Sequence, residues 1–175
     1  MLSPKINQYI ENSKINGKLC RWDKSAISIF ITEITLQTAD KSFLYSEIQR
    51  AIMLWNNTLR ENGINIRFEQ VNAPTNADII IHWTKVGRVF EGMCKYPSII
   101  NGIFKKIFID IGLANELSPK EVTDKSIFST MLHELGHSLG LGHGVDIDDV
   151  MFVPHQKNVQ RPSENDIYVL KSIYR

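Results

Sequence analysis

The feature that most constrains this chain is a short segment, residues 133–143, which reads HELGHSLGLGH and holds three of the five histidines. Apolar residues recur at spacings of three and four through this region and predict a helix over about 126–139. His133 and His137 therefore lie four residues apart on a helix, about 40° from eclipsed, and both imidazoles project from the same face. Two ring nitrogens placed in this way can reach one metal ion.

A third ligand comes from the end of the same segment. Gly140 can adopt the left-handed conformation that ends a helix and turns the chain, which brings His143 back to the ion. A catalytic zinc ion takes three protein ligands and keeps an open position for water, whereas a structural zinc usually has four ligands and favours cysteine. Neither cysteine lies near this segment. The sequence therefore predicts one catalytic zinc ion bound by His133, His137 and His143.

The acidic residue next to the first ligand meets a second requirement of hydrolysis. Glu134 lies about 100° round the helix from His133, so its carboxylate reaches a metal-bound water and does not bind the metal itself. Zinc lowers the pKa of such a water, and a nearby carboxylate can accept its proton and return it to the departing amine. We interpret the segment as the catalytic centre of a zinc-dependent endopeptidase, with Glu134 as the general base.

Residues 133–143 match the extended zinc signature of the metzincin metallopeptidases. From about residue 24 to the C-terminus the chain also resembles the matrixin branch, the group that includes the matrix metalloproteinases. A methionine turn follows the third histidine in that family, and Met151 stands at the expected place. The resemblance implies that Met151 lies beneath the zinc as a hydrophobic base.

The sequence departs from the family at two places. Matrixins usually read Met-Tyr-Pro at the methionine turn, whereas here Phe152 follows the methionine and the proline is delayed to Pro154. The resemblance implies a substrate pocket at Phe152 and Pro154. Vertebrate members carry a structural zinc and calcium ions in the loop before the edge strand, but residues 87–110 contain no histidine and few acids. We therefore expect neither a structural zinc nor calcium.

Periodicity and turn residues predict the order of the remaining elements. The expected fold class is α/β (α+β) and metzincin-like, with a twisted mixed sheet of four to five strands, two main helices and a small C-terminal subdomain that ends in a helix. We expect a long loop at 87–101 and a peptide-binding edge strand at 105–111. The other strands are predicted at 26–34, 64–71 and 77–83, and the other helices at 42–59 and 163–174.

Residues 1–24 show no sustained periodicity and predict an extension with at most one irregular turn. We expect the catalytic domain to be residues 25–175, complete without this extension, which could serve as a short pro-segment. Cys20 and Cys94 are too few for a disulfide framework, and they are either two free thiols or one bridge.

Composition narrows the partners and the location. The net charge is +1 and the basic residues are scattered, so we expect no nucleic-acid partner. No apolar run approaches the ~18 residues of a membrane span, and no signal peptide is recognisable. We expect a monomer that acts on peptide or protein substrates and that a protein inhibitor or its own propeptide could block. It would be either cytoplasmic or the mature, trimmed form of a secreted protein.

Two other functions stay open at this point. The chain could be a catalytically silent zinc domain that binds peptides or an inhibitor, although a carboxylate beside an open metal position has no use in such a module. It could also be a self-processing protease that cuts its own N-terminus. The sequence does not determine the substrate or the cleavage rule.

Overall fold

One mixed sheet forms the frame of the molecule. The computed structural model describes residues 3–35, 41–86, 92–115, 124–154 and 158–175. The five strands lie in the order β4-β3-β5-β7-β6, and all neighbours are parallel except β6 and β7. The predicted fold class, with a four- to five-stranded mixed sheet, is confirmed. The strands are β3 (Ala26–Ile31), β4 (Arg67–Gln70), β5 (Ile79–Val86), β6 (Gly92–Ile100) and β7 (Ile103–Asn115).

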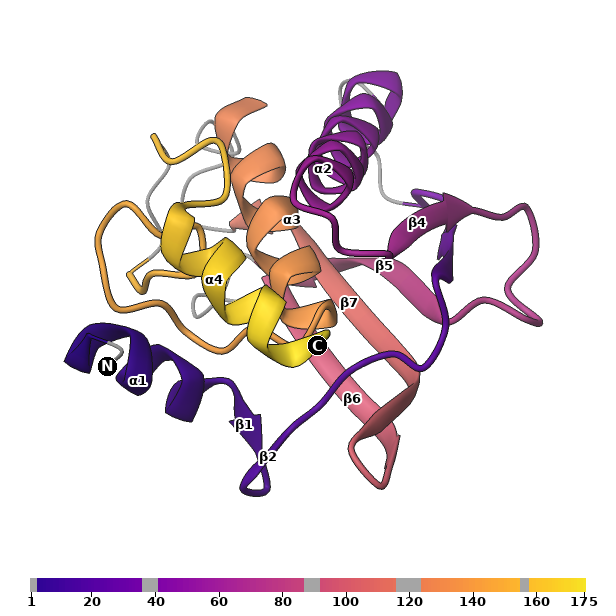
Figure 1. The fold of residues 1–175 in the computed structure, drawn as a ribbon. Coiled ribbons are helices and arrows are strands. Elements are labelled where there is room, and N and C mark those ends of the chain that lie inside the picture. The colour runs from indigo at the N-terminus through magenta and orange to yellow at the C-terminus, as the bar shows by residue number, and fades with distance from the viewer. Residues whose placement is uncertain (1–2, 36–40, 87–91, 116–123, 155–157) are drawn as a thin grey trace.

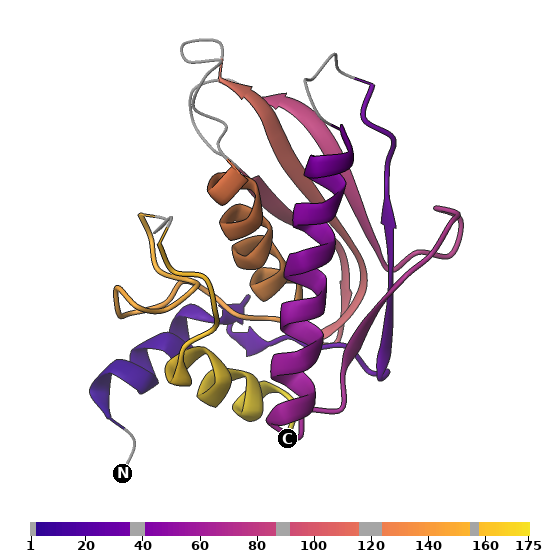
Figure 2. The same cartoon turned by 90° about the horizontal axis from the view of Figure 1, so that it is seen from above.

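Two long helices cover one face of this sheet (Figures 1 and 2). They are α2 (Lys41–Glu61) and α3 (Asp124–Ser138), which lie side by side and agree with the two main helices of the prediction. Trp55 of α2 is fully buried between them, and its Nε1 donates a hydrogen bond to the Leu132 carbonyl at 2.9 Å. This contact joins the helix that carries the histidines to the rest of the core.

The C-terminal subdomain ends in α4 (Glu164–Ile173), as predicted. Ser163 is its N-cap: the Ser163 hydroxyl accepts from the backbone N–H of Asp166, and the Asp166 carboxylate accepts from the N–H of Ser163. This reciprocal pair is a capping box, which fixes the start of the helix.

The N-terminal segment differs from the prediction. It forms α1 (Pro4–Asn12) and a small hairpin of β1 (Lys14–Ile15) and β2 (Lys18–Leu19), so the expectation of at most one irregular turn was wrong. Tyr9, Cys20 and Trp22 are buried in the main core. A nine-residue helix is marginal by itself and depends on tertiary packing, which a local pattern does not show. The boundary at residue 24 stays a prediction.

The region before β7 also differs from the prediction. The expected loop at 87–101 is wrong over 92–100, which form β6, and residues 105–111 belong to β7 inside the sheet and not to its edge. Asn101 and Gly102, with φ of 53° and 80°, make the two-residue turn of a hairpin. An Asn-Gly pair is the strongest short-range hairpin signal, and a proline such as Pro97 is tolerated in an edge strand.

The cysteines and the apolar helices bear on two smaller expectations. Cys20 and Cys94 are free thiols, so the alternative of a bridge does not apply to this structure. No helix in the described ranges is long and apolar enough to cross a membrane.

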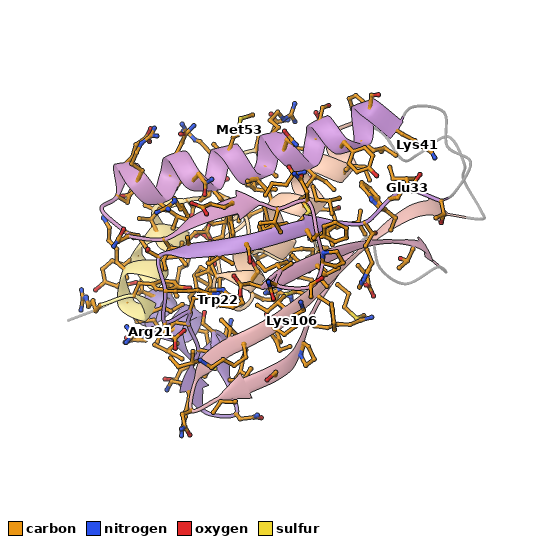
Figure 3. The ribbon with its side chains drawn as sticks, turned by 90° about the vertical axis from the view of Figure 1, so that its right-hand side faces the viewer. Arg21, Trp22, Glu33, Lys41, Met53 and Lys106 are labelled. Carbon is orange, nitrogen blue, oxygen red and sulfur yellow. The ribbon has the colours of Figure 1, made fainter. Side chains whose placement is uncertain are left out.

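Substituting the buried tryptophan tests the packing of the two long helices. Trp55→Ala should lower the free energy of unfolding by about 3–5 kcal/mol, because it leaves a cavity and removes the bond to Leu132. Met53→Ala is the matched control, since Met53 is 58% exposed on the face of α2 that points away from the sheet (Figure 3). Met53→Ala should change the free energy of unfolding by less than about 0.5 kcal/mol. Equal losses in urea unfolding of the two variants would contradict this packing.

Candidate metal centre

Three histidines from the end of α3 and the loop after it converge on one point. His133 and His137 lie on α3, and His143 follows the helix by five residues. Their ligating nitrogens all lie within 4.8 Å of one another. The structure therefore brings together the three residues that the sequence predicted as metal ligands.

Backbone carbonyls set the orientation of the two helical histidines. The Nδ1 atom of His133 lies 2.9 Å from the Val150 carbonyl, and Nδ1 of His137 lies 2.8 Å from the Leu141 carbonyl. A carbonyl oxygen can only accept, so each Nδ1 carries the proton and each Nε2 keeps its lone pair for a metal. Burial lowers the pKa of His137 to about 4, which keeps this ring neutral, as a ligand must be.

The donor set fits a zinc ion. Three neutral imidazoles with an open position are a common catalytic zinc set, in which tetrahedral ligands are about 3.3–3.4 Å apart at the usual bond lengths. The observed nitrogens, all within 4.8 Å of one another, are compatible with that spacing. Within the part of the chain that the structure describes, this is the one group of three or more metal-binding side chains close enough to share an ion. The expected absence of structural zinc and calcium stays a prediction.

The loop that carries His143 is held by a buried carboxylate. Gly140 has a φ of 99°, in the left-handed region, and lies two residues after the end of α3. The prediction that this glycine ends the helix is confirmed. One oxygen of Asp149 accepts from the N–H groups of Val145 and Asp146. The other oxygen accepts from the side chains of Ser163 and Asn165. Because four donors converge on Asp149, the loop is tied both to itself and to the start of α4.

Met151 packs against the backbone of the helix that carries the first two histidines. Its side chain is fully buried, and a Cβ added to Gly136 would meet the Met151 sulfur at 2.3 Å. Gly136 stands between His133 and His137 on α3, so the thioether packs directly on the helix backbone between the two ligands. This placement is compatible with the role that the resemblance implies for Met151.

Asp166 holds the segment that orients His133, a contact that the sequence analysis did not predict. It is fully buried, and one carboxylate oxygen accepts from the backbone N–H groups of Val150 and Ser163, while the other accepts from the Tyr9 hydroxyl. Burial raises the pKa of Asp166, and these hydrogen bonds oppose the rise. Since the Val150 carbonyl orients His133, Asp166 is linked to this ligand through a single residue, Val150. In the sequence, Ser163 three residues earlier indicates only that Asp166 can take part in the cap of α4.

Glu134 lies on α3 beside the histidines and is 6% exposed. Its carboxylate accepts a hydrogen bond from the backbone N–H of Cys94 on β6, and its Oε2 atom has no hydrogen-bond partner among the described residues. Burial raises the pKa of Glu134 to about 8, and a dication at the histidines would lower it again. An oxygen left without a partner in this position is suited to accept and return a proton.

Gly92 is a second residue that the sequence analysis missed. It begins β6, and a Cβ added there would lie 2.6 Å from Thr130 Cγ2 and 2.8 Å from Glu134 Cγ. Only glycine therefore lets the edge strand approach α3 closely enough for Cys94 to hold Glu134. The sequence shows Gly92 as a turn residue, and no local pattern indicates this contact.

The predicted pocket residues lie beyond the methionine. Phe152 is half-buried, Val153 is 49% exposed and Pro154 is exposed. Their role in a substrate pocket stays a prediction, and the next residue, His155, lies outside the described ranges.

Comparison with known proteins points to one family. The family model described as matrixin matches residues 109–175, which include the three histidines, Glu134 and Met151. Over 49 residues the chain is 39% identical to matrix metalloproteinase-A of Caenorhabditis elegans. That stretch is 28% of this chain and spans only 9% of the length of the relative. Over residues 109–175 the family model confirms the resemblance predicted from the sequence, and for the residues before 109 it stays a prediction.

A single methyl group at the start of β6 tests how closely the strand must approach. Gly92→Ala should displace Glu134 or the strand and lower kcat for a test peptide by about 10²-fold, the effect of misplacing a catalytic group by about 1 Å. Bound zinc should be unchanged because no ligand is touched. Ser98→Ala on the same strand is the control and should keep kcat. An unchanged kcat in Gly92→Ala, measured at saturating substrate, would show that the approach of β6 is not needed.

Proposed function

We propose that this matrixin-like chain is a zinc-dependent endopeptidase. The observation that carries the proposal is the convergence of His133, His137 and His143 on one point, with the buried Glu134 beside them and an open-edged strand next to Glu134. The match of residues 109–175 to the matrixin model supports it independently of the geometry.

The residues of the site divide the chemistry between them. Zinc bound by the three histidines would act as a Lewis acid and lower the pKa of a water molecule to near neutrality. The Glu134 carboxylate takes the proton from the attacking water and then gives it to the departing amine. The Cys94 N–H holds this carboxylate in place, and the buried surroundings keep bulk water from competing for it.

The edge of the sheet next to α3 supplies a place for the substrate backbone. Among the residues that the structure describes, β6 has a partner strand only on its β7 side, so an extended peptide can pair with its other side. Pro97 has no N–H to donate, and the register of β6 with β7 shifts between Lys95 and Ser98. We therefore place the bound peptide along residues 92–96, beside Glu134, and not along 105–111 as the sequence predicted.

The choice of substrate side chain rests on residues after the methionine. We propose that Phe152 and Pro154 border the pocket for the residue after the scissile bond, with a preference for a medium-sized to large apolar side chain. The chain would act as a monomer on peptide or protein substrates, and a protein or propeptide inhibitor could occupy the same groove.

A catalytically silent peptide-binding domain is the second candidate. It would need the zinc and the edge strand but not a buried glutamate with an oxygen left without a partner. The Oε2 atom of Glu134, which makes no hydrogen bond within the described residues, therefore favours the enzyme. Self-processing of the N-terminus would be a further use of the same chemistry.

Removing the base tests the enzyme against the silent domain. Glu134→Ala should keep the fold and the zinc but lose peptide hydrolysis by several orders of magnitude, since acid and base catalysis each contribute about 10²–10⁴-fold. Glu69→Ala, an exposed acid on β4, is the control and should keep full activity. Hydrolysis of a fluorogenic peptide library would be measured with and without a chelator. If Glu134→Ala cleaves as fast as the control, the proposed mechanism is wrong.

Removing a ligand should affect the metal instead of the proton transfer. Elemental analysis of the dialysed protein should find one zinc ion per chain. His143→Ala should weaken zinc binding by more than the roughly 10–100-fold that loss of an outer partner of a ligand costs. Excess zinc should restore part of the activity of His143→Ala but none of that of Glu134→Ala. Two tightly held zinc ions, or bound calcium, would contradict the single-metal prediction.

A further inference from the structure

The N-terminal helix and the turn after it lie against the loop that carries the third histidine (Figures 1 and 2). The Ser13 hydroxyl accepts a hydrogen bond from the backbone N–H of Gly142 at 2.9 Å and donates to the Tyr9 carbonyl at 2.9 Å. Asn12 Nδ2 donates to the carbonyl of His143 at 3.0 Å. The backbone before and after the third ligand is therefore held by side chains about 130 residues earlier in the chain.

The backbones of the N-terminal segment and of the loop after α3 lie so close together that no side chain fits between them. A Cβ added to Gly142 would lie 2.0 Å from the Asn12 carbonyl oxygen and 2.6 Å from the Ser13 nitrogen. A Cβ on Gly140 would lie 2.3 Å from the Cys20 carbonyl oxygen. Glycine at position 142 therefore lets the N-terminal segment pack on the loop backbone.

The third ligand needs this support more than the other two. His133 and His137 belong to a helix, whereas His143 is exposed and lies in a loop without regular structure. An exposed side chain on a loop keeps a fixed position only if the backbone beneath it is held. Ser13, which is 2% exposed, makes a buried contact of this kind. A ligand that is held in place before the metal arrives loses less freedom on binding.

We propose that Ser13 and Asn12 are positioning residues for the zinc site, which hold Gly142 and His143 so that the third ligand faces the other two. The proposal rests on the proposed function only in that His143 binds zinc. It places the N-terminal segment inside the catalytic domain, against the boundary at residue 24 that the sequence predicts.

An inhibitory pro-segment would be expected to occupy the metal position or the substrate groove. No histidine, cysteine, aspartate or glutamate from the described residues 3–24 joins the histidine cluster. The N-terminal segment instead contacts the backbone of the ligand loop and, through Trp22 Nε1, the Ser138 carbonyl at the end of α3. These contacts support the site and do not block it.

Zinc affinity measured on the full chain tests the proposal. Competition with a chromophoric chelator of known affinity should show a loss of about 10–100-fold for Ser13→Ala, the usual effect of removing a residue that supports a ligand. Asn12→Ala should show a smaller, several-fold loss. Asn12→Asp should bind zinc more weakly than Asn12→Ala, because it turns a carboxylate toward the His143 carbonyl. Asn7→Ala, at an exposed position of the same helix, and Ser46→Ala on α2 are matched controls and should bind as the wild type does.

A second measurement keeps the test decisive if Ser13→Ala is poorly folded. In the metal-free protein the amide hydrogen of Gly142 should exchange faster in Ser13→Ala than in the wild type and the controls. The Asn12 variants alter an exposed side chain and should stay folded, so their zinc affinity decides in that case.

Failure of the proposed function and failure of the positioning role would give different patterns of zinc affinity. If the wild type and His143→Ala bind zinc equally weakly, the proposed function is wrong. If the wild type binds zinc tightly and His143→Ala does not, but the Asn12 and Ser13 variants match their controls, the proposed function stands and the positioning role is overturned.

Discussion

The buried carboxylate of Asp166 joins three segments that are far apart in the sequence. It accepts hydrogen bonds from the Tyr9 hydroxyl on α1, from the N–H of Val150 beside the methionine, and from the N–H of Ser163 at the start of α4. Removing a carboxylate from water costs free energy unless hydrogen-bond donors surround it. If these segments separated, the Asp166 carboxylate would lose the donors that compensate for its burial. The geometry of the metal ligands depends on that union, because the Val150 carbonyl orients His133.

The loop after α3 therefore has two tasks at once. It carries His143, and its backbone carbonyls at Leu141 and Val150 fix the rings of the two helical histidines. A displacement of the loop would change all three ligands together and not only the one it bears. This explains why so many contacts converge on a segment without regular structure, from Asp149 inside the loop to the N-terminal helix outside it.

Close approaches of backbone are the second constraint on the site. Gly136 admits the Met151 sulfur, Gly92 admits Glu134, and Gly142 admits the backbone of the N-terminal segment. At each place a Cβ would fall within 3 Å of a neighbouring atom, a separation that close-packed interiors do not tolerate. These positions need glycine because a side chain would have no room. At Gly140 glycine also permits a positive φ.

The features that depend on local backbone geometry could be predicted from the sequence. The helical period places His133, Glu134 and His137 on neighbouring parts of one helix, Gly140 ends it, and Ser163 caps the last helix. Alternation and apolar runs located β3, β4, β5 and β7, but not the short β1 and β2, nor β6, although its Asn101-Gly102 turn is a typical hairpin signal. Three features could not be predicted in this way: which strand forms the edge of the sheet, the helix α1, and the hydrogen bond from Tyr9 to Asp166. These features depend on contacts between residues as far as 157 positions apart, and such contacts leave no period in the local sequence.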